Sequence, residues 1–257
     1  MSKRNTPQRR HTILALLNEQ GEVSVDPLAR QFETSEVTIR KDLAALEKNG
    51  LLLRRYGGAV PMPQELISEP SQPVSAYKQA IARAAVGCIR EHARIIIDSG
   101  TTTAAMIPQL GPKPGLVVMT NSLNVARALS ELEHEPVLLM TGGTWDPHSE
   151  SFQGQVAEQV LRSYDFDQLF IGADGIDLQR GTTTFNELLG LSRVMAEVAR
   201  EVIVMVEADK IGRKIPNLEL PWSSIRTLIT DERLPAEARE QIAARGVNLI
   251  CAATQAK

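Results

Sequence analysis

The stretch Ser24–Val60, SVDPLARQFETSEVTIRKDLAALEKNGLLLRRYGGAV, decides the fold of the N-terminal part of this chain. Its apolar spacing predicts a short helix that begins after Ser24 and, beyond a turn, a longer helix. Thr34 or Ser35 is suited to cap the longer helix, and Asn49-Gly50 is a typical signal for its end. Two helices joined by so short a turn predict a helix-turn-helix motif.

The residues around this motif complete a small domain. Residues 51–60 predict a hairpin whose tip, 54–58, is basic and glycine-rich. Upstream, a first helix is predicted over residues 7–19, with Thr6 as its N-cap and Pro7 at its first position. The sequence therefore predicts a winged helix-turn-helix domain over residues 1–60.

The second helix of such a motif enters the major groove of DNA, where its N-terminal residues touch base edges. Its apolar residues are expected to turn inward, namely Val37, Ile39, Leu43 and Leu46. The exposed residues expected to contact DNA are Ser35, Glu36, Thr38, Arg40 and Lys41. Phosphate contacts are expected from Lys41 and from Arg54 and Arg55 in the wing, and Tyr56 and Gly57 of the wing are also expected to bind DNA. The alternative for the helix is an ordinary solvated charged face.

Composition and charge agree with two domains of different character. The chain has 257 residues, which exceeds the usual size of one domain. Residues 1–60 carry ten basic and seven acidic side chains, and the remainder carries 18 basic and 24 acidic ones. A basic head on an acidic body suits a module that binds a polyanion, tethered to one that does not.

Other classes of protein are not indicated. There is no apolar run of about 18 residues, and the first residues lack the apolar core of a signal peptide, so a cytoplasmic protein is expected. Cys88 and Cys251 lie far apart without a metal or redox spacing and are predicted to be reduced, buried thiols. No cofactor or metal site is predicted.

The composition changes at residues 61–73, which contain four prolines and predict a linker. From residue 74 to residue 257, predicted helices and strands alternate, and apolar runs such as Ile95–Ile97 indicate strands buried on both faces. This pattern predicts an α/β domain with a mostly parallel sheet. The predicted helices are 76–91, 102–110, 122–132, 155–163, 187–200 and 235–245, and the predicted strands are 94–98, 116–120, 137–141, 168–172, 201–206, 226–230 and 247–251.

Small and polar residues follow several of these strands. Ligands of open α/β sheets bind at the carboxyl ends of the strands, so these residues form the candidate site. Asp98-Ser99-Gly100-Thr101-Thr102-Thr103 follows one strand and opens a helix, which favours a nest for an anion such as a phosphate; an ordinary capped helix is the alternative. The other candidates, from the ends of further strands, are Asn121, Gly142, Gly143, Asp174, Asn186, Glu187 and Lys210. Together they predict a pocket for a phosphorylated polyol or sugar.

The run Val37–Leu43, followed by Leu46–Gly50 and by Tyr56–Ala59, resembles the DNA-binding signature of the DeoR family of bacterial transcriptional regulators. The resemblance spans nearly the whole chain. It implies a C-terminal sensor domain with a fold similar to that of ribose-5-phosphate isomerase. Within the family, the segments 142–154 and 170–187 look most like regulators of amino-sugar metabolism, which implies an effector such as glucosamine 6-phosphate. Trp145-Asp146 departs from the Leu-Arg of many members.

The resemblance also implies roles for the candidate residues. Ser99, Gly100, Thr101, Thr102 and Thr103 correspond to the phosphate loop, and Asp174, Asn186, Glu187 and Lys210 line the place where the isomerase does its chemistry. The isomerase has Asp-Gly-Ala-Asp where this chain has Ile171-Gly172-Ala173-Asp174. Because the first acid is missing, part of the acid/base apparatus is lost, and binding without turnover is expected.

The expected function is a DNA-binding regulator, by family resemblance a repressor, that responds to a phosphorylated sugar. One head makes too few base contacts for genomic specificity, so a homo-oligomer, dimer or tetramer, is expected to place paired heads on double-stranded operator DNA. Two alternatives stay open: a sugar-phosphate isomerase with an appended DNA-binding head, and a winged helix that binds protein.

Overall fold

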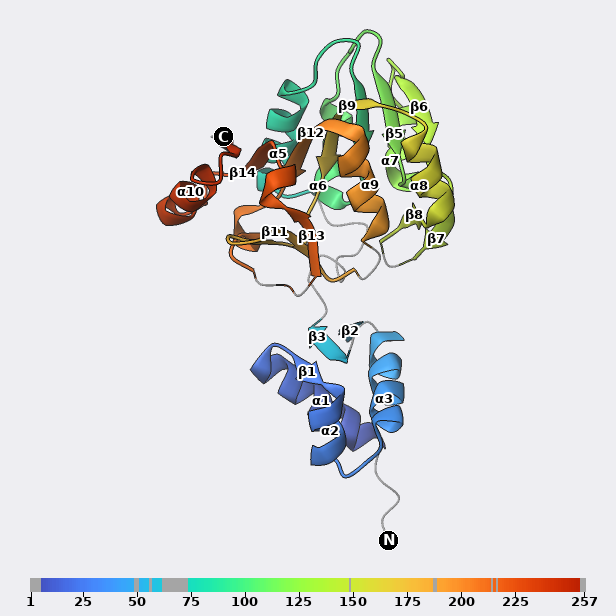
Figure 1. The fold of residues 1–257 in the computed structure, drawn as a ribbon, viewed down its shortest axis with the longest axis vertical. Coiled ribbons are helices and arrows are strands. Elements are labelled where there is room, and N and C mark those ends of the chain that lie inside the picture. The colour runs from blue at the N-terminus through green and yellow to red at the C-terminus, as the bar shows by residue number, and fades with distance from the viewer. Residues whose placement is uncertain are drawn as a thin grey trace. The chain divides into compact units, whose positions relative to one another are not determined.

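The computed structural model describes residues 6–48, 51–55, 57–61, 74–147, 149–186, 189–213, 215 and 217–254. The chain divides into two compact units, Met1–Gln72 and Pro73–Lys257 (Figure 1). Each unit has its own hydrophobic core. The predicted linker lies almost wholly in residues 62–73, outside the described residues, so the predicted domain limits stay a prediction. Among the described helices, none is both long and apolar enough to cross a membrane.

The N-terminal unit is a winged helix-turn-helix, as predicted. Its small sheet has the order β1-β3-β2, with antiparallel neighbours, and β2 and β3 form the wing. The turn between the second and third helices is closed by the Thr34 N–H, which donates to the Ala29 carbonyl oxygen at 2.9 Å. Its elements are α1 (Thr6–Gln20), β1 (Val23–Ser24), α2 (Val25–Gln31), α3 (Glu36–Lys48), β2 (Leu52–Arg55) and β3 (Gly58–Pro61).

The three helices and the wing close around one core. α1 includes Thr6 as a helical residue, so the predicted N-cap role of Thr6 is wrong by one position. In α3, Ser35 provides the cap, because the Thr38 N–H donates to the Ser35 Oγ at 3.2 Å. The side chains that form the centre of the core are each at most 4% exposed: Ile13, Leu17, Val23, Val25, Leu28, Ile39, Leu43, Leu46 and Leu52.

The prediction that Val37 turns inward is wrong, because this side chain is 57% exposed. Ile39, Leu43 and Leu46 form the buried stripe of α3. Val37 precedes Ile39 by two residues, which places it about 200° around the helix axis from that side chain. An apolar residue therefore lies on the solvent face of the helix.

The C-terminal unit is built on a seven-stranded sheet of order β15-β14-β12-β9-β4-β5-β6 in which every pair of neighbours is parallel. The α/β class with a mostly parallel sheet is thus confirmed. The strands are β4 (Arg94–Ile97), β5 (Val117–Thr120), β6 (Val137–Met140), β9 (Phe166–Ile171), β12 (Ala199–Met205), β14 (Thr227–Asp231) and β15 (Asn248–Ala252).

Helices cover both faces of this sheet (Figure 1). In β4, Ile95 and Ile97 belong to one apolar cluster and Ile96 belongs to the other, as expected for alternating side chains of a strand buried on both faces. The first cluster includes α5 (Ala76–Gly87), η1 (Ile107–Gln109) and α7 (Leu123–Ser130), and the second includes α8 (Gln155–Arg162), α9 (Gly190–Val198) and α10 (Ala236–Ala243).

Two small β structures at the carboxyl edge of the sheet were not predicted. β7 (Thr144–Asp146) and β8 (Ser151–Gln153) form a hairpin in which Trp145 packs edge-on against Phe152 at 5.5 Å between ring centroids. The second structure is a sheet of order β10-β11-β13, made of β10 (Gly175–Asp177), β11 (Gly181–Thr184) and β13 (Asn217–Pro221).

Three predicted helices differ from the structure. The helix predicted over 102–110 is only the short α6 (Thr101–Ala104) followed by η1, since Pro108 cannot donate a helical hydrogen bond. The helix predicted over 187–200 begins at Gly190 and ends at Val198, because Ala199 already pairs with Phe166 in the sheet. α5 ends at Gly87, four residues early. Cys88 and Cys251 are free thiols, as predicted, but they are partly rather than fully buried.

Candidate functional site

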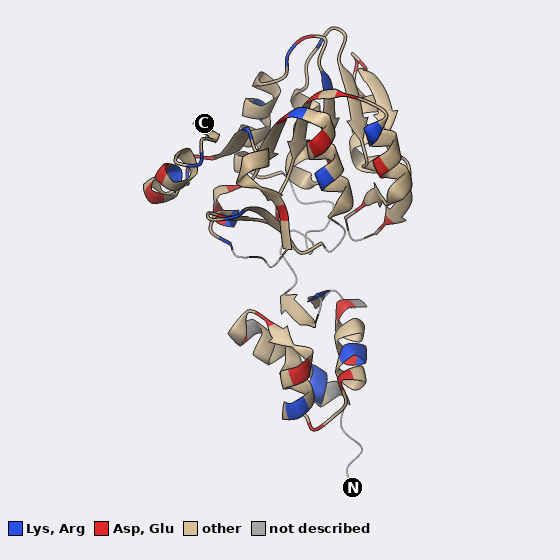
Figure 2. Ribbon diagram, viewed as in Figure 1, with Lys and Arg blue, Asp and Glu red and all other residues tan. Residues whose placement is uncertain are grey.

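The exposed side of α3 carries the residues predicted to contact DNA (Figure 2 marks basic residues on α3 and in the wing). Arg40 pairs with Glu36 one turn earlier at 2.5 Å, and both side chains are largely exposed. The hydroxyl groups of Ser35 and Thr38 lie 2.9 Å apart and share a hydrogen bond. Lys41 is exposed. The structure thus places all five predicted residues at the start of one helix.

The wing presents its cations in the same unit. Arg54 donates from its backbone N–H and from its Nε to the Glu47 carboxylate, at 2.9 and 2.7 Å, and Arg55 pairs with Glu22 at 2.5 Å. Each pair has one largely exposed and one mostly buried side chain. The Gly57 carbonyl oxygen accepts from the Val25 N–H at 2.7 Å and ties the wing to α2. Tyr56 lies outside the described residues.

Asp42 links α3, the helix predicted to read DNA and called the reading helix below, to α1. It is 2% exposed, and its two carboxylate oxygens lie 2.5 Å from the Arg9 Nε and 2.8 Å from the Arg10 Nε. Arg40-Lys41-Asp42 is therefore no uniform solvated face: Arg40 and Lys41 are exposed, while Asp42 is buried. Only Asp42 departs from the solvated charged face considered as the alternative, and Arg40 and Lys41 remain open to either interpretation.

The predicted phosphate loop lies between β4 and α6, at the carboxyl edge of the sheet. Gly100 has a φ of +138°, a conformation that favours glycine. The Thr103 hydroxyl is fully buried and donates to the carbonyl oxygens of Asp98 and Gly100 at 2.8 and 3.0 Å. Thr103 thus shapes the loop from within, whereas Ser99, Gly100 and Thr101 are at least partly accessible to a ligand.

A lysine that the sequence did not single out reaches this loop. Lys78, from the first turn of α5, donates to the Thr101 Oγ1 at 3.1 Å and lies 3.7 Å from a carboxylate oxygen of Glu207. Glu207 also accepts from the Ser75 hydroxyl at 2.9 Å. A cation beside free hydroxyl and N–H groups is what a phosphate nest requires. Lys78 was missed because no local motif connects it with a loop some twenty residues away.

Predicted residues from neighbouring strand ends meet the loop. The Asn121 Oδ1, at the end of β5, accepts from the Ser99 N–H at 3.1 Å. Asn121 is 1% exposed, and its Nδ2 has no hydrogen-bond partner within the described part of the chain. Gly142 and Gly143 follow β6, the next strand, and Gly143 has a φ of +116° with the Gln153 carbonyl oxygen close by.

The strand ends beyond β4 contribute the remaining predicted residues. Asp174, after β9, accepts from the Thr184 hydroxyl at 2.7 Å and from the Phe185 N–H at 3.1 Å. Thr184 in turn accepts from the Asn186 N–H at 3.0 Å. Lys210, after β12, is 8% exposed and donates to the Ala173 carbonyl oxygen at 3.4 Å. Glu187 lies outside the described residues.

Three acids interact electrostatically beside the loop. Burial raises the pKa of Asp98 to about 6, and the Asp174 carboxylate adds to the increase. Burial also raises the pKa of Glu219 to about 8, with further increases from Asp98 and Asp174, although the Ser192 and Thr182 hydroxyls donate to it at 2.8 and 3.3 Å. Glu219 was missed because its strand, β13, was not predicted. Burial and mutual repulsion thus favour the protonated forms of Asp98 and Glu219.

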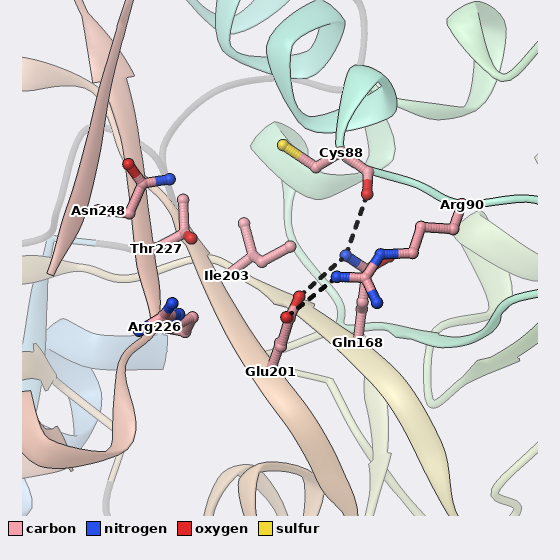
Figure 3. A pocket seen from close by; sticks show the side chains of 8 residues that line it. All are labelled: Cys88, Arg90, Gln168, Glu201, Ile203, Arg226, Thr227 and Asn248. Atoms are coloured by element: carbon pink, nitrogen blue, oxygen red, sulfur yellow. Dashed lines mark hydrogen bonds and ion pairs between the residues drawn. The ribbon is translucent and has the colours of Figure 1, made fainter.

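A separate cavity of about 280 Å³ lies at the opposite edge of the sheet, where β9, β12, β14 and β15 begin (Figure 3). The Gln168 Nε2 donates to the Cys88 carbonyl oxygen at 3.1 Å, and Arg90 pairs with Glu201 at 3.2 Å. Burial raises the pKa of the Cys88 thiol, which keeps it protonated. None of the predicted effector residues lines this cavity. Its lining residues are Cys88, Arg90, Gln168, Glu201, Ile203, Arg226, Thr227 and Asn248.

Family models match both units. Residues 9–65 match the DeoR-like helix-turn-helix domain, and residues 74–232 match the DeoR C-terminal sensor domain. The chain belongs to the DeoR family. The family resemblance of the sequence is thereby confirmed, and this DeoR-family protein is a transcriptional regulator with a DNA-binding head and a small-molecule sensor.

Curated relatives cover the chain nearly end to end. The DeoR-family protein is 41% identical to a putative aga operon transcriptional repressor of Escherichia coli O157:H7, over 95% of this chain and 93% of that one. It is 32% identical to the HTH-type transcriptional regulator GlpR of Haloferax volcanii, over 95% and 96% of the two chains. A solved D-ribose-5-phosphate isomerase in complex with phospho-erythronic acid is 21% identical over 55% of each chain, with a TM-score of 0.40. The relatives are regulators, so the alternative of an isomerase with an appended head is set aside.

Proposed function

We propose that this DeoR-family protein is a repressor whose affinity for operator DNA is controlled by a phosphorylated amino sugar such as glucosamine 6-phosphate. The observation that carries the proposal is the juxtaposition of the 98–103 loop and Lys78 with the acids Asp98, Asp174 and Glu219. The relative whose name ties it to the aga operon and to repression supports the same assignment.

The loop and Lys78 are assigned to the phosphate of the effector. Ser99, Thr101 and Thr102 supply hydroxyl groups, the loop supplies backbone N–H groups, and the Lys78 ammonium supplies charge. On binding, the phosphate takes over the hydrogen bond that Lys78 makes to Thr101. The Asn121 amide lies beside the loop, where its Oδ1 accepts from the Ser99 N–H.

The acids are assigned to the amino group. Burial and repulsion between the acids raise the pKa of Asp98 and Glu219. A ligand ammonium placed beside Asp98, Asp174 and Glu219 would offset the repulsion. Binding of the ammonium therefore releases protons from Asp98 and Glu219. The preference for the amine over a neutral hydroxyl at the same sugar position should increase as the pH rises from 6 to 8. Asn186 and Lys210 are assigned to the sugar hydroxyl groups.

Control of DNA binding requires that the effector favour one arrangement of paired heads. We propose a homo-oligomer in which α3 and the wing of each of two heads contact one half-site of the operator. A coupling free energy of about 1–3 kcal/mol shifts operator affinity about 5- to 150-fold, which is enough for a switch.

The test measures binding of the full-length protein to a labelled operator duplex, with glucosamine 6-phosphate, glucose 6-phosphate or glucosamine added. We expect glucosamine 6-phosphate to change operator affinity at the lowest concentration. Equal potency of glucose 6-phosphate at pH 8 would remove the amine assignment, and equal potency of glucosamine would remove the phosphate assignment. A protein that shows no salt-dependent affinity for DNA would instead favour a winged helix that binds protein.

Variants locate the site. Lys78→Met and Thr102→Ala should leave operator affinity unchanged without effector and should weaken the response to glucosamine 6-phosphate, about tenfold or more for Lys78→Met because a charged hydrogen bond is lost. Lys113→Met is the matched control, since the Lys113 ammonium also donates to a protein oxygen, that of Ile89 at 3.2 Å, outside the loop. A normal response in Lys78→Met and Thr102→Ala would contradict the assignment of the nest.

A further inference from the structure

Val37 is the exposed apolar residue at the start of the reading helix. Its side chain is 57% exposed, while Ile39 and Leu43 of the same helix are at most 1% exposed. Val37, Arg40 and Lys41 are spaced at i, i+3 and i+4, so they share one face of α3. That face carries the cations and points away from the core of the head.

The neighbouring polar groups already have partners. The hydroxyl groups of Ser35 and Thr38 share a hydrogen bond, and Glu36 pairs with Arg40. These polar groups can exchange their partners for bases or phosphates. The isopropyl group of Val37 can form no hydrogen bond, and in the free protein much of its surface is in water. A valine on this face gains free energy only if an apolar group covers it.

On the edges of the base pairs in the major groove, the apolar group is the C5-methyl of thymine, and apolar side chains read it by direct contact. The N-terminal residues of a reading helix are those that reach base edges. We propose that Val37 is a specificity-determining residue that packs against the methyl group of one thymine in each operator half-site. The inference rests on DNA reading by α3 and extends it to a residue that carries no hydrogen-bonding group.

The test compares thymine with deoxyuridine, which lacks only the methyl group. An operator is first obtained by selecting duplexes from a random library with the full-length protein. Each thymine is then replaced by deoxyuridine, one position at a time, and the dissociation constants of wild type and Val37→Ala are measured. Alanine favours helix at least as well as valine, so the variant keeps the helix.

We expect one thymine per half-site at which deoxyuridine weakens wild-type binding about 3- to 10-fold, in keeping with the burial of roughly one methyl group. At that position Val37→Ala should bind thymine and deoxyuridine equally, while it still discriminates at other positions. Val156→Ala is the matched control, because Val156 is 59% exposed on α8 of the sensor unit and should leave every ratio unchanged.

Two results would overturn the proposal. In the first, Val37→Ala shows the same ratio of dissociation constants for deoxyuridine and thymine as the wild type at every position. In the second, removal of a thymine methyl group leaves wild-type binding unchanged at every position. In the second case, a loss of self-association in Val37→Ala would assign the valine to contact with a second copy instead. A protein that selects no duplex at all would contradict DNA reading itself, and this outcome is distinct from both.

Discussion

The Nε of Arg9 lies 2.5 Å from the Asp42 carboxylate, and this buried ion pair joins the first helix of the head to its reading helix. Arg10 binds the other carboxylate oxygen at 2.8 Å. The pair is one of the polar links between α1 and α3, which otherwise meet through apolar side chains such as Ile13 and Leu43. One buried acid, which is absent from the exposed face of α3, thus links the reading helix to two arginines of α1.

Asp42→Asn should destabilise the head by about 3 kcal/mol, because it leaves the guanidinium of Arg9 buried without a counter-charge. Hydrogen exchange of the α3 amides should accelerate, and operator affinity should fall. Asp26→Asn is the control: it breaks the exposed pair between Asp26 and Arg30 on α2 and should change neither quantity noticeably. Unchanged exchange in Asp42→Asn would show that the apolar contacts alone hold the helix.

Arg40 and Arg54 should differ in what their removal does. Arg40→Ala is expected to cost about 1–3 kcal/mol of operator binding and to relax the preference at one base pair. Arg54→Ala, in the wing, should weaken binding to all sequences alike and should reduce the slope of log affinity against log salt by about one. Binding to a set of single-base operator variants at several salt concentrations separates the two. An unchanged preference in Arg40→Ala would move that residue to the phosphate contacts.

Gly143→Ala should destabilise the sensor unit more than Gly142→Ala. A Cβ at Gly143 would lie 2.6 Å from the Gln153 carbonyl oxygen, whereas a Cβ at Gly142 meets nothing within 4 Å. Both glycines have a positive φ, +60° at Gly142 and +116° at Gly143, so a side chain is strained at either position and more so at Gly143, where the clash with the β8 backbone is added. Urea unfolding followed by tryptophan fluorescence measures the difference, since both tryptophans, Trp145 and Trp222, belong to this unit. Equal urea midpoints for the two variants would mean that the β7–β8 hairpin moves to accommodate the added Cβ at little cost in free energy.

Glu219 should make the stability of the sensor unit depend on pH. Its folded pKa of about 8 lies above the ordinary value, so between pH 4.5 and 8 the folded state binds more protons than the unfolded state. The free energy of unfolding should therefore fall as the pH rises through this window, by up to about 1.4 kcal/mol per unit from this group. Glu219→Gln should flatten the profile above pH 6, where Asp98 is already ionised. If the free energy of unfolding has the same pH dependence in wild type and Glu219→Gln, then a group other than Glu219 causes that dependence.

The sequence predicts those parts of the fold that local patterns determine. The Ile95–Ile97 run was predicted as a strand because a continuous apolar run is typical of a parallel sheet buried on both faces, and the 98–103 loop follows it as expected. The prediction that Val37 is buried was wrong because it followed from the apolar character of the residue and not from its angular position on the helix. Glu219 and Lys78 could not be found, since each reaches the site from an element distant in sequence. β13 has too few residues, of both polar and apolar type, to show the alternation typical of a strand. Lys78 lies in α5, a helix in which no local motif indicates a site.

The first turn of α5 has two attachments with a mechanical consequence. Lys78 bonds to Thr101, and Ser75, through its hydroxyl, bonds to Glu207, so this turn is fastened to two carboxyl-edge segments of the sheet. The same turn is where the sensor unit begins after the linker, only a few residues along the backbone. An anion that displaces Lys78 from Thr101 would leave the bond from Ser75 to Glu207 as the remaining one of these two attachments.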